Sequence, residues 1–112
     1  MRSMSRSSVQ RFLDEAAQRL AGQPDVETVI LYGSHAWGSP DEDSDVDLFI
    51  VADTDEEGTE RWLRFRELLA GDRQRVPFDV LVLTPDELDE RREMGDPFIE
   101  EILDRGRRLS AA

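Results

Sequence analysis

Cysteine is absent from this chain of 112 residues, which excludes disulfides and metal sites built on thiolates. Disulfides mark oxidising compartments, so a chain without cysteine is compatible with the cytoplasm, and we expect it there. Long apolar runs are missing too, because none approaches the ~20 residues that a membrane-spanning helix needs. We therefore expect no association with a membrane.

Basic residues are scarce relative to acidic ones. The chain has 14 Lys and Arg residues against 26 Asp and Glu residues, and its formal net charge is −12. An acidic surface repels the phosphate backbone of a nucleic acid, and the sequence has no basic stripe that would reverse this repulsion. We therefore expect no direct binding of nucleic acid. A small nucleotide held through a metal ion is compatible with this charge, and a basic protein partner is favoured by it.

The sequence shows no internal repeat and no second domain, and 112 residues suffice for one modest core. Helical and strand patterns alternate along the chain, which is typical of a mixed sheet flanked by helices. The sequence thus predicts a single α/β (α+β) domain over residues 1–112. Its first six residues are rich in Arg and Ser, and we expect them to be frayed.

Three apolar segments predict the main strands of the sheet: Val26–Tyr32, Asp45–Ala52 and Phe78–Leu83. The first segment is almost continuously apolar, which favours a central strand covered on both faces. A short edge strand is expected at residues 107–109.

Helices are expected before, between and after these strands. Apolar residues at helical spacing over residues 9–20 predict an amphipathic helix that ends at Gly22, and further helices are expected at 33–37, 59–70, 85–93 and 96–105. In the helix at 59–70 we expect two aromatic residues in the core, Trp62 and Phe65. We expect its arginines on the outer side: Arg61, Arg64 and Arg66. The last helix is expected to bury an apolar stripe: Phe98, Ile99, Ile102 and Leu103.

Residues suited to chemistry gather around the first two predicted strands. Gly33 and Ser34 follow the first strand, and Asp45 and Asp47 open the second strand ten residues later. Side chains two apart on a strand share a face, so these carboxylates lie roughly 7 Å apart and repel each other unless a cation lies between them. Backbone N–H groups after Gly33 and the Ser34 hydroxyl suit a phosphate. The layout predicts a metal-dependent nucleotide site.

Asp79 interrupts the third predicted strand. A half-buried carboxylate without a partner is costly, and a cation shared with Asp45 and Asp47 removes that cost. Three carboxylates facing a triphosphate accumulate repulsion on the order of 10 kcal/mol at an effective dielectric of about 20. Mg²⁺ suits oxygen ligands completed by phosphate and water. We therefore expect these three residues to hold Mg²⁺, as two ions by the logic of two-metal sites, and Asp79 is a candidate base for an incoming hydroxyl.

The spaced motif resembles the signature of a known family. Gly33-Ser34, ten residues and then Asp45-x-Asp47 resemble the signature of the DNA polymerase β-like nucleotidyltransferases, and the short chain resembles their minimal nucleotidyltransferase branch. Residues 78–85 resemble the later strand of that family, which carries the third acidic residue. Residues 96–109 resemble its C-terminal helix and final short strand. The resemblance implies catalytic, metal-binding roles for Asp45, Asp47 and Asp79, and nucleotide binding by Gly33 and Ser34.

The resemblance also implies an activity and a partner. ATP would be the substrate, and AMP would be transferred with release of pyrophosphate. Members of this branch are commonly encoded beside HEPN-domain proteins as toxin–antitoxin pairs, so the implied acceptor is a hydroxyl, of a tyrosine, on a HEPN toxin. A chain of 112 residues leaves little room for an acceptor-binding domain, which fits an acceptor on another protein. Two alternatives stay open: an idle steric antitoxin that neutralises its partner by binding, and a transferase acting on a small molecule.

Simpler interpretations apply to parts of this region. The acidic stretch at 41–47 is also compatible with a solvated turn. A calcium loop is disfavoured, because Val46 stands where such a loop needs Gly and Ala52 stands where it needs Glu. His35, the only histidine, is interpreted as a surface residue of the short helix. Trp37 occupies a position where many members of the family have Arg, and we expect it to pack against the first helix.

Overall fold

The structure is a computed structural model that describes residues 6–38, 45–71 and 76–109. The elements are α1 (Arg6–Ala21), β1 (Val26–Tyr32), α2 (Ser34–Trp37), β2 (Val46–Ala52), α3 (Gly58–Ala70), β3 (Phe78–Leu83), α4 (Pro85–Glu93), α5 (Pro97–Arg105) and β4 (Arg107–Arg108). The predicted strands are confirmed, except that β2 begins at Val46 and not at Asp45, and β4 ends at Arg108 and not at residue 109. Residues 1–5 of the expected frayed start and the acidic residues 41–44 lie outside the described residues, whereas Arg6 begins α1. Within those residues no helix is long and apolar enough to cross a membrane.

The strands form one mixed sheet in the order β3-β2-β1-β4. β1 is antiparallel to both of its neighbours, β2 and β4, whereas β2 and β3 are parallel. A parallel pair needs a crossover connection, and α3 supplies it. The prediction that the first strand is central in a mixed sheet flanked by helices is confirmed.

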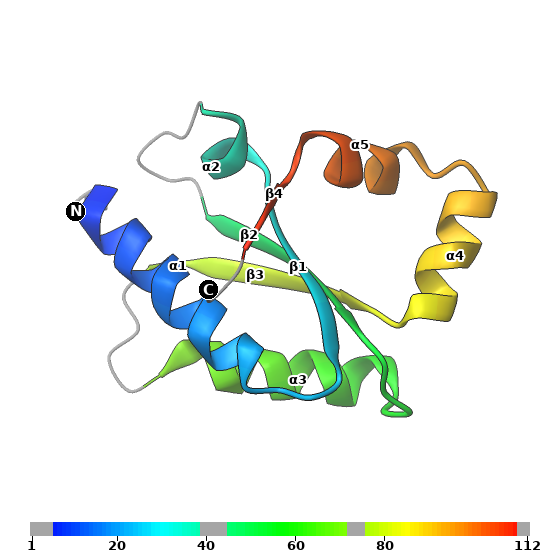
Figure 1. Cartoon of the computed structure of the whole chain (residues 1–112), viewed down its shortest axis with the longest axis horizontal. Coiled ribbons are helices and arrows are strands. Elements are labelled where there is room, and N and C mark those ends of the chain that lie inside the picture. The colour runs from blue at the N-terminus through cyan, green and yellow to red at the C-terminus, as the bar shows by residue number, and fades with distance from the viewer. Residues whose placement is uncertain (1–5, 39–44, 72–75, 110–112) are drawn as a thin grey trace.

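Helices cover the two faces of the sheet and build two cores (Figure 1). One core packs α1 and α3 on the sheet through Phe12, Leu13, Ala16, Leu20, Phe65 and Leu69. The opposite face carries α5, which buries Ile99 and Ile102 against Ile30, Phe49, Val51 and Leu83. Period-two alternation along β2 explains this division, since Val46, Leu48 and Ile50 face the first core and Phe49 and Val51 face the second.

Several predictions for α3 and α5 are wrong. Arg61 is only 7% exposed, and its Nη2 lies 2.6 Å from Oε1 of Glu87 in α4, which offsets part of the cost of burying the charge. Its buried Nε has no hydrogen-bond partner among the described residues. Trp62 is 39% exposed and lines a hollow beside β3 with Val80, Leu81 and Val82. Phe98 is 46% exposed and contacts Tyr32 edge-on, with ring centroids 5.7 Å apart.

The last residue of α2 makes a contact that the sequence did not indicate. The guanidinium of Arg105 in α5 lies 4.4 Å from the centroid of the Trp37 indole. The expected packing of Trp37 against the first helix stays a prediction. The indole Nε1 is buried and has no hydrogen-bond partner among the described residues. Trp37 therefore links α2 to the helix on the second face of the sheet.

Candidate active site

Three strand ends meet at one end of the sheet. β1 finishes at Tyr32, which pairs with Asp47 near the start of β2, and Asp47 pairs in turn with Asp79 near the start of β3. Neighbouring strands lie about 4.8 Å apart, so the three residues form a row across the sheet. Alternation places this row on the same face as Phe49 and Leu81, which contribute to the core beneath α5. The topology thus brings together Asp47 and Asp79, which are far apart in the sequence.

Asp47 is the electrostatic centre of this row. Burial raises the pKa of its carboxyl, and the negative charges of Asp79 and Asp45 raise it further, while the positive form of His35 acts in the opposite direction. The carboxylate therefore carries repulsion that nothing in the described structure fully offsets. His35, interpreted from the sequence as a surface residue, is close enough to influence the site.

Gly33 brings the backbone against this carboxylate. A Cβ built at Gly33 would overlap Oδ2 of Asp47, and the glycine has φ +78° and ψ −164°, a region that only glycine readily adopts. The N–H groups of Ala36 and Trp37 both donate to the Gly33 carbonyl at 3.0 Å, which closes the turn into α2. Ser34 is the first residue of α2 and is half-buried. The Gly33-Ser34 motif therefore lies directly beside Asp47.

Asp79 has a different environment from Asp47. Its side chain is 63% exposed, its Oδ1 accepts the backbone N–H of Val80 at 3.0 Å, and the same oxygen lies 3.9 Å from Nη1 of Arg66. β3 is the end strand of the sheet, so Asp79 belongs to its edge. Asp45 directly precedes β2 and is exposed.

The donor set can be compared with the needs of Mg²⁺. Within the described residues, no three His, Cys, Asp or Glu side chains are grouped closely enough to hold a metal ion. The chemistry nevertheless fits, because Asp47 and Asp79 supply the oxygen ligands that Mg²⁺ prefers and the repulsion at Asp47 calls for a cation.

Two residues of this site were missed by reasoning from the sequence. Burial raises the pKa of Tyr32 to about 12, and the charges of Asp47 and Asp79 contribute to the shift. The position of Tyr32 directly before Gly33 could have indicated that it belongs to the site. A tyrosine within an apolar run is, however, typical of a core position. Arg66 belongs to α3 and reaches the site only because α3 packs beside β3, which helical spacing alone does not reveal.

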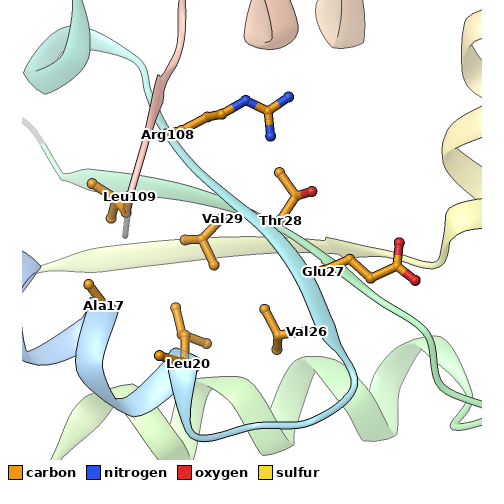
Figure 2. A pocket seen from close by; sticks show the side chains of 9 residues that line it. Ala17, Leu20, Val26, Glu27, Thr28, Val29, Arg108 and Leu109 are labelled. Atoms are coloured by element: carbon orange, nitrogen blue, oxygen red, sulfur yellow. The ribbon is translucent and has the colours of Figure 1, made fainter. Parts of the chain in front are cut away.

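The hollows of the surface lie away from these carboxylates. One of about 290 Å³ lies between α1, β1 and β4, where Figure 2 shows the apolar side chains of Leu20, Val26 and Val29 facing one another. Another of about 420 Å³ lies along β3 beside Trp62. Neither of these two hollows is lined by Asp45, Asp47 or Asp79.

Comparison with known proteins agrees with the fold. The family described as "Polymerase beta, Nucleotidyltransferase" matches residues 14–110, which include every candidate site residue. Among solved structures, a candidate nucleotidyltransferase from Sulfolobus solfataricus is 24% identical, with a TM-score of 0.55 over 78% of this chain and 82% of that chain. This likeness supports the fold. No curated protein matches the chain significantly.

Proposed function

The chain belongs to the polymerase beta nucleotidyltransferase family, and from this premise we propose that it transfers AMP from ATP to a hydroxyl of a HEPN-domain toxin and thereby acts as an antitoxin. One observation carries the proposed transferase activity: the Asp47 carboxylate lies against the Gly33 backbone and beside Asp79 on the neighbouring strand. The tyrosine acceptor and the HEPN partner rest on the resemblance of the spaced motif to the minimal nucleotidyltransferase branch.

The proposed reaction joins the acceptor oxygen to the α-phosphorus of ATP, breaks the bond from that phosphorus to the leaving oxygen, and releases pyrophosphate. The acceptor proton passes to a base, for which Asp79 is the candidate because its carboxylate is solvent-accessible at the strand edge. The glycine at position 33 lets a phosphate approach the backbone closely, and the Ser34 hydroxyl is available as a donor. Mg²⁺ held by Asp45, Asp47 and Asp79, expected as two ions, would supply the positive charge that offsets the phosphates.

The charge of the protein supports a protein acceptor over a nucleic acid. The net charge of −12 repels a phosphate backbone, whereas it attracts a basic protein surface. The place of the site at one end of the sheet, where β1 finishes and β2 and β3 begin, is compatible with an acceptor presented by a second protein.

Intact mass spectrometry of the partner tests the proposal. Incubated with the chain, ATP and Mg²⁺, the partner should gain the mass of one or more AMP units, and the double variant Asp45→Asn with Asp47→Asn should abolish that gain. Asp53→Asn with Asp55→Asn is the matched control, because it removes two exposed carboxylates of the same spacing just beyond the other end of β2. Loss of transfer in the control as well would show that net charge, and not the site, is responsible.

A steric antitoxin is the second candidate, and it is favoured because no three acidic or His side chains of the described residues are grouped closely enough to hold a metal ion. The two candidates differ in what the Asp45 and Asp47 double variant does in cells that express the partner. If the variant binds the partner yet no longer protects, transfer is the protective activity. If it protects as well as the unmodified chain and the partner carries no AMP, the steric candidate replaces the proposed enzyme.

A further inference from the structure

Arg66 is fixed beside the candidate site by contacts with the edge of the sheet. Its Nη1 donates a hydrogen bond to the Phe78 carbonyl at 3.3 Å. The guanidinium carbon lies 5.0 Å from the centroid of the Phe78 ring and 5.2 Å from that of Trp62. A guanidinium held between two rings and a carbonyl has a defined position, because each contact restricts a different direction of movement.

This position lies next to the outer carboxylate of the site. Nη1 of Arg66 is 3.9 Å from Oδ1 of Asp79, and the same Oδ1 accepts the Val80 N–H at 3.0 Å. Asp47 pairs with Asp79 from the inner neighbour β2, and the charge of Asp79 contributes to raising the pKa of the Asp47 carboxyl, after burial. Oδ1 of Asp79 is thus engaged by the Val80 N–H and lies near Arg66. A cation that binds this oxygen would compete with both contacts.

We propose that Arg66 is a positioning residue that holds Asp79 at the edge of the sheet in the metal-free protein and competes with a divalent cation for that carboxylate. The proposal rests on the proposed function only in assuming that a cation binds between Asp47 and Asp79. Two effects act in the same direction. The guanidinium occupies the carboxylate that the cation needs, and its positive charge repels the cation at short range.

Manganese binding is the direct test, with Mn²⁺ alone as the probe and the signal of free Mn²⁺ in electron paramagnetic resonance as the readout. Arg66→Gln should bind Mn²⁺ about two- to five-fold more tightly than the unmodified chain, the range expected for loss of a partly exposed ion pair. Arg66→Lys keeps the positive charge and should retain most of the competition, so its affinity should lie close to that of the unmodified chain.

Arg92→Gln is the matched control. It removes an exposed arginine whose Nε also lies 3.9 Å from a carboxylate, that of Glu100, but away from the candidate site. It reports how much a change of one unit in net charge alters Mn²⁺ affinity. Asp47→Asn must weaken Mn²⁺ binding for the measured site to be the proposed one.

The outcomes separate this proposal from the proposed function. Equal or weaker Mn²⁺ binding by Arg66→Gln, with a clear loss in Asp47→Asn, overturns the role of Arg66 and leaves the cation site intact. Mn²⁺ binding that is absent or insensitive to Asp47→Asn overturns both. Tighter binding by Arg66→Gln in a chain that transfers no AMP supports the role of Arg66 and removes the enzymatic function alone.

Discussion

Gly33 lies so close to Asp47 that any side chain at position 33 would overlap the carboxylate oxygen Oδ2. The contact joins the turn after β1 to the start of β2, and it explains why the turn begins with glycine. The backbone and the carboxylate therefore depend on each other for their positions.

Replacing Gly33 with Ala should destabilise the fold by about 1–3 kcal/mol through backbone strain, and it should also displace the Asp47 carboxylate. Urea unfolding measures the free energy, and calorimetry measures the affinity for ATP in the presence of Mg²⁺. Gly95→Ala is the control, because Gly95 also has a positive φ, 71°, but a Cβ at that position would meet no atom within 4 Å. Gly95→Ala should cost about 1 kcal/mol and leave ATP affinity unchanged. Equal effects of the two variants on ATP affinity would contradict the role of Gly33.

Asp47→Asn should stabilise the metal-free protein at neutral pH by less than about 1 kcal/mol, because it removes repulsion from Asp79 and Asp45. The pKa of Asp47 is raised in the folded state. Above the folded pKa, the ionised Asp47 carboxylate lowers the free energy of unfolding by its full amount. Below the usual pKa of 3.8 the carboxyl is protonated in both states, and this effect vanishes. Urea unfolding in the presence of chelator should give Asp47→Asn a higher free energy of unfolding than the unmodified chain at neutral pH, and this gain should disappear at acid pH. Asp89→Asn, an exposed change in α4, should show no comparable gain, and a destabilised Asp47→Asn variant would refute the repulsion.

Tyr32 offers a spectroscopic test of the same row, because it is the only tyrosine of the chain. Burial and the charges of Asp47 and Asp79 raise its pKa to about 12, so at pH 10 the folded protein should show little tyrosinate absorbance. The unfolded chain ionises first, and the free energy of unfolding should fall as the pH rises from 10 toward 12. Asp47→Asn and Asp79→Asn should each lower the pKa. Asp45→Asn should leave it unchanged, and a folded protein that titrates near 10 would disprove the arrangement.

Arg61 and Glu87 link α3 to α4, and breaking this pair should destabilise the fold. Burial raises the pKa of Glu87, but the Arg61 hydrogen bond and the Thr84 N–H outweigh burial and hold it below its usual value of 4.5. Arg61→Met should cost about 1–3 kcal/mol at neutral pH, since one partner is buried and the other is partly exposed. The pair stabilises the fold completely above the usual pKa of Glu87, and this stabilisation is lost as the pH falls through the lowered pKa of the folded state. The difference in free energy of unfolding between the unmodified chain and Arg61→Met should therefore shrink in acid. Arg92→Met, with an exposed ion pair, should change stability by less than about 1 kcal/mol at either pH.

ATP binding should depend on a divalent cation, because the acidic residues of the site repel a triphosphate. Calorimetric titration should detect binding with Mg²⁺ or Mn²⁺ and none with chelator. Ser34→Ala should weaken binding by about 1 kcal/mol, the contribution of one hydrogen bond. Equal affinity with and without chelator would remove the argument for a shared cation.

The strands could be predicted from the sequence because their signals are local. The apolar runs of β1 and β3 end at sharp polar or glycine boundaries, and the pairing of Asp47 with Asp79 follows once β2 and β3 are parallel. The capping box of Thr84 and Glu87 fixes the start of α4 in the same way.

The side chains of α3 could not be predicted from spacing alone. Arg61 is expected at the surface until Glu87 of another helix is placed opposite it. Trp62 is expected in the core until its contact with Arg66 and its place beside β3 are known. The nearness of Arg66 to Asp79 likewise follows only from the packing of α3 beside β3. In each case the environment of the side chain depends on a contact between two elements, which the local sequence pattern does not reveal.

The parallel pairing of β2 and β3 also has a consequence for the order of folding. β3 is an edge strand that joins the sheet through a long crossover, and Asp79 meets Asp47 only when it docks. The repulsion between Asp47 and Asp79 therefore arises only when β3 docks, which is a long-range step that can follow the pairing of β1 with β2. If β3 docks after the rate-limiting barrier, Asp79→Asn should slow unfolding and leave the folding rate nearly unchanged. The acidic residues proposed for chemistry would then make β3 detach more readily than a strand of the same length without Asp79.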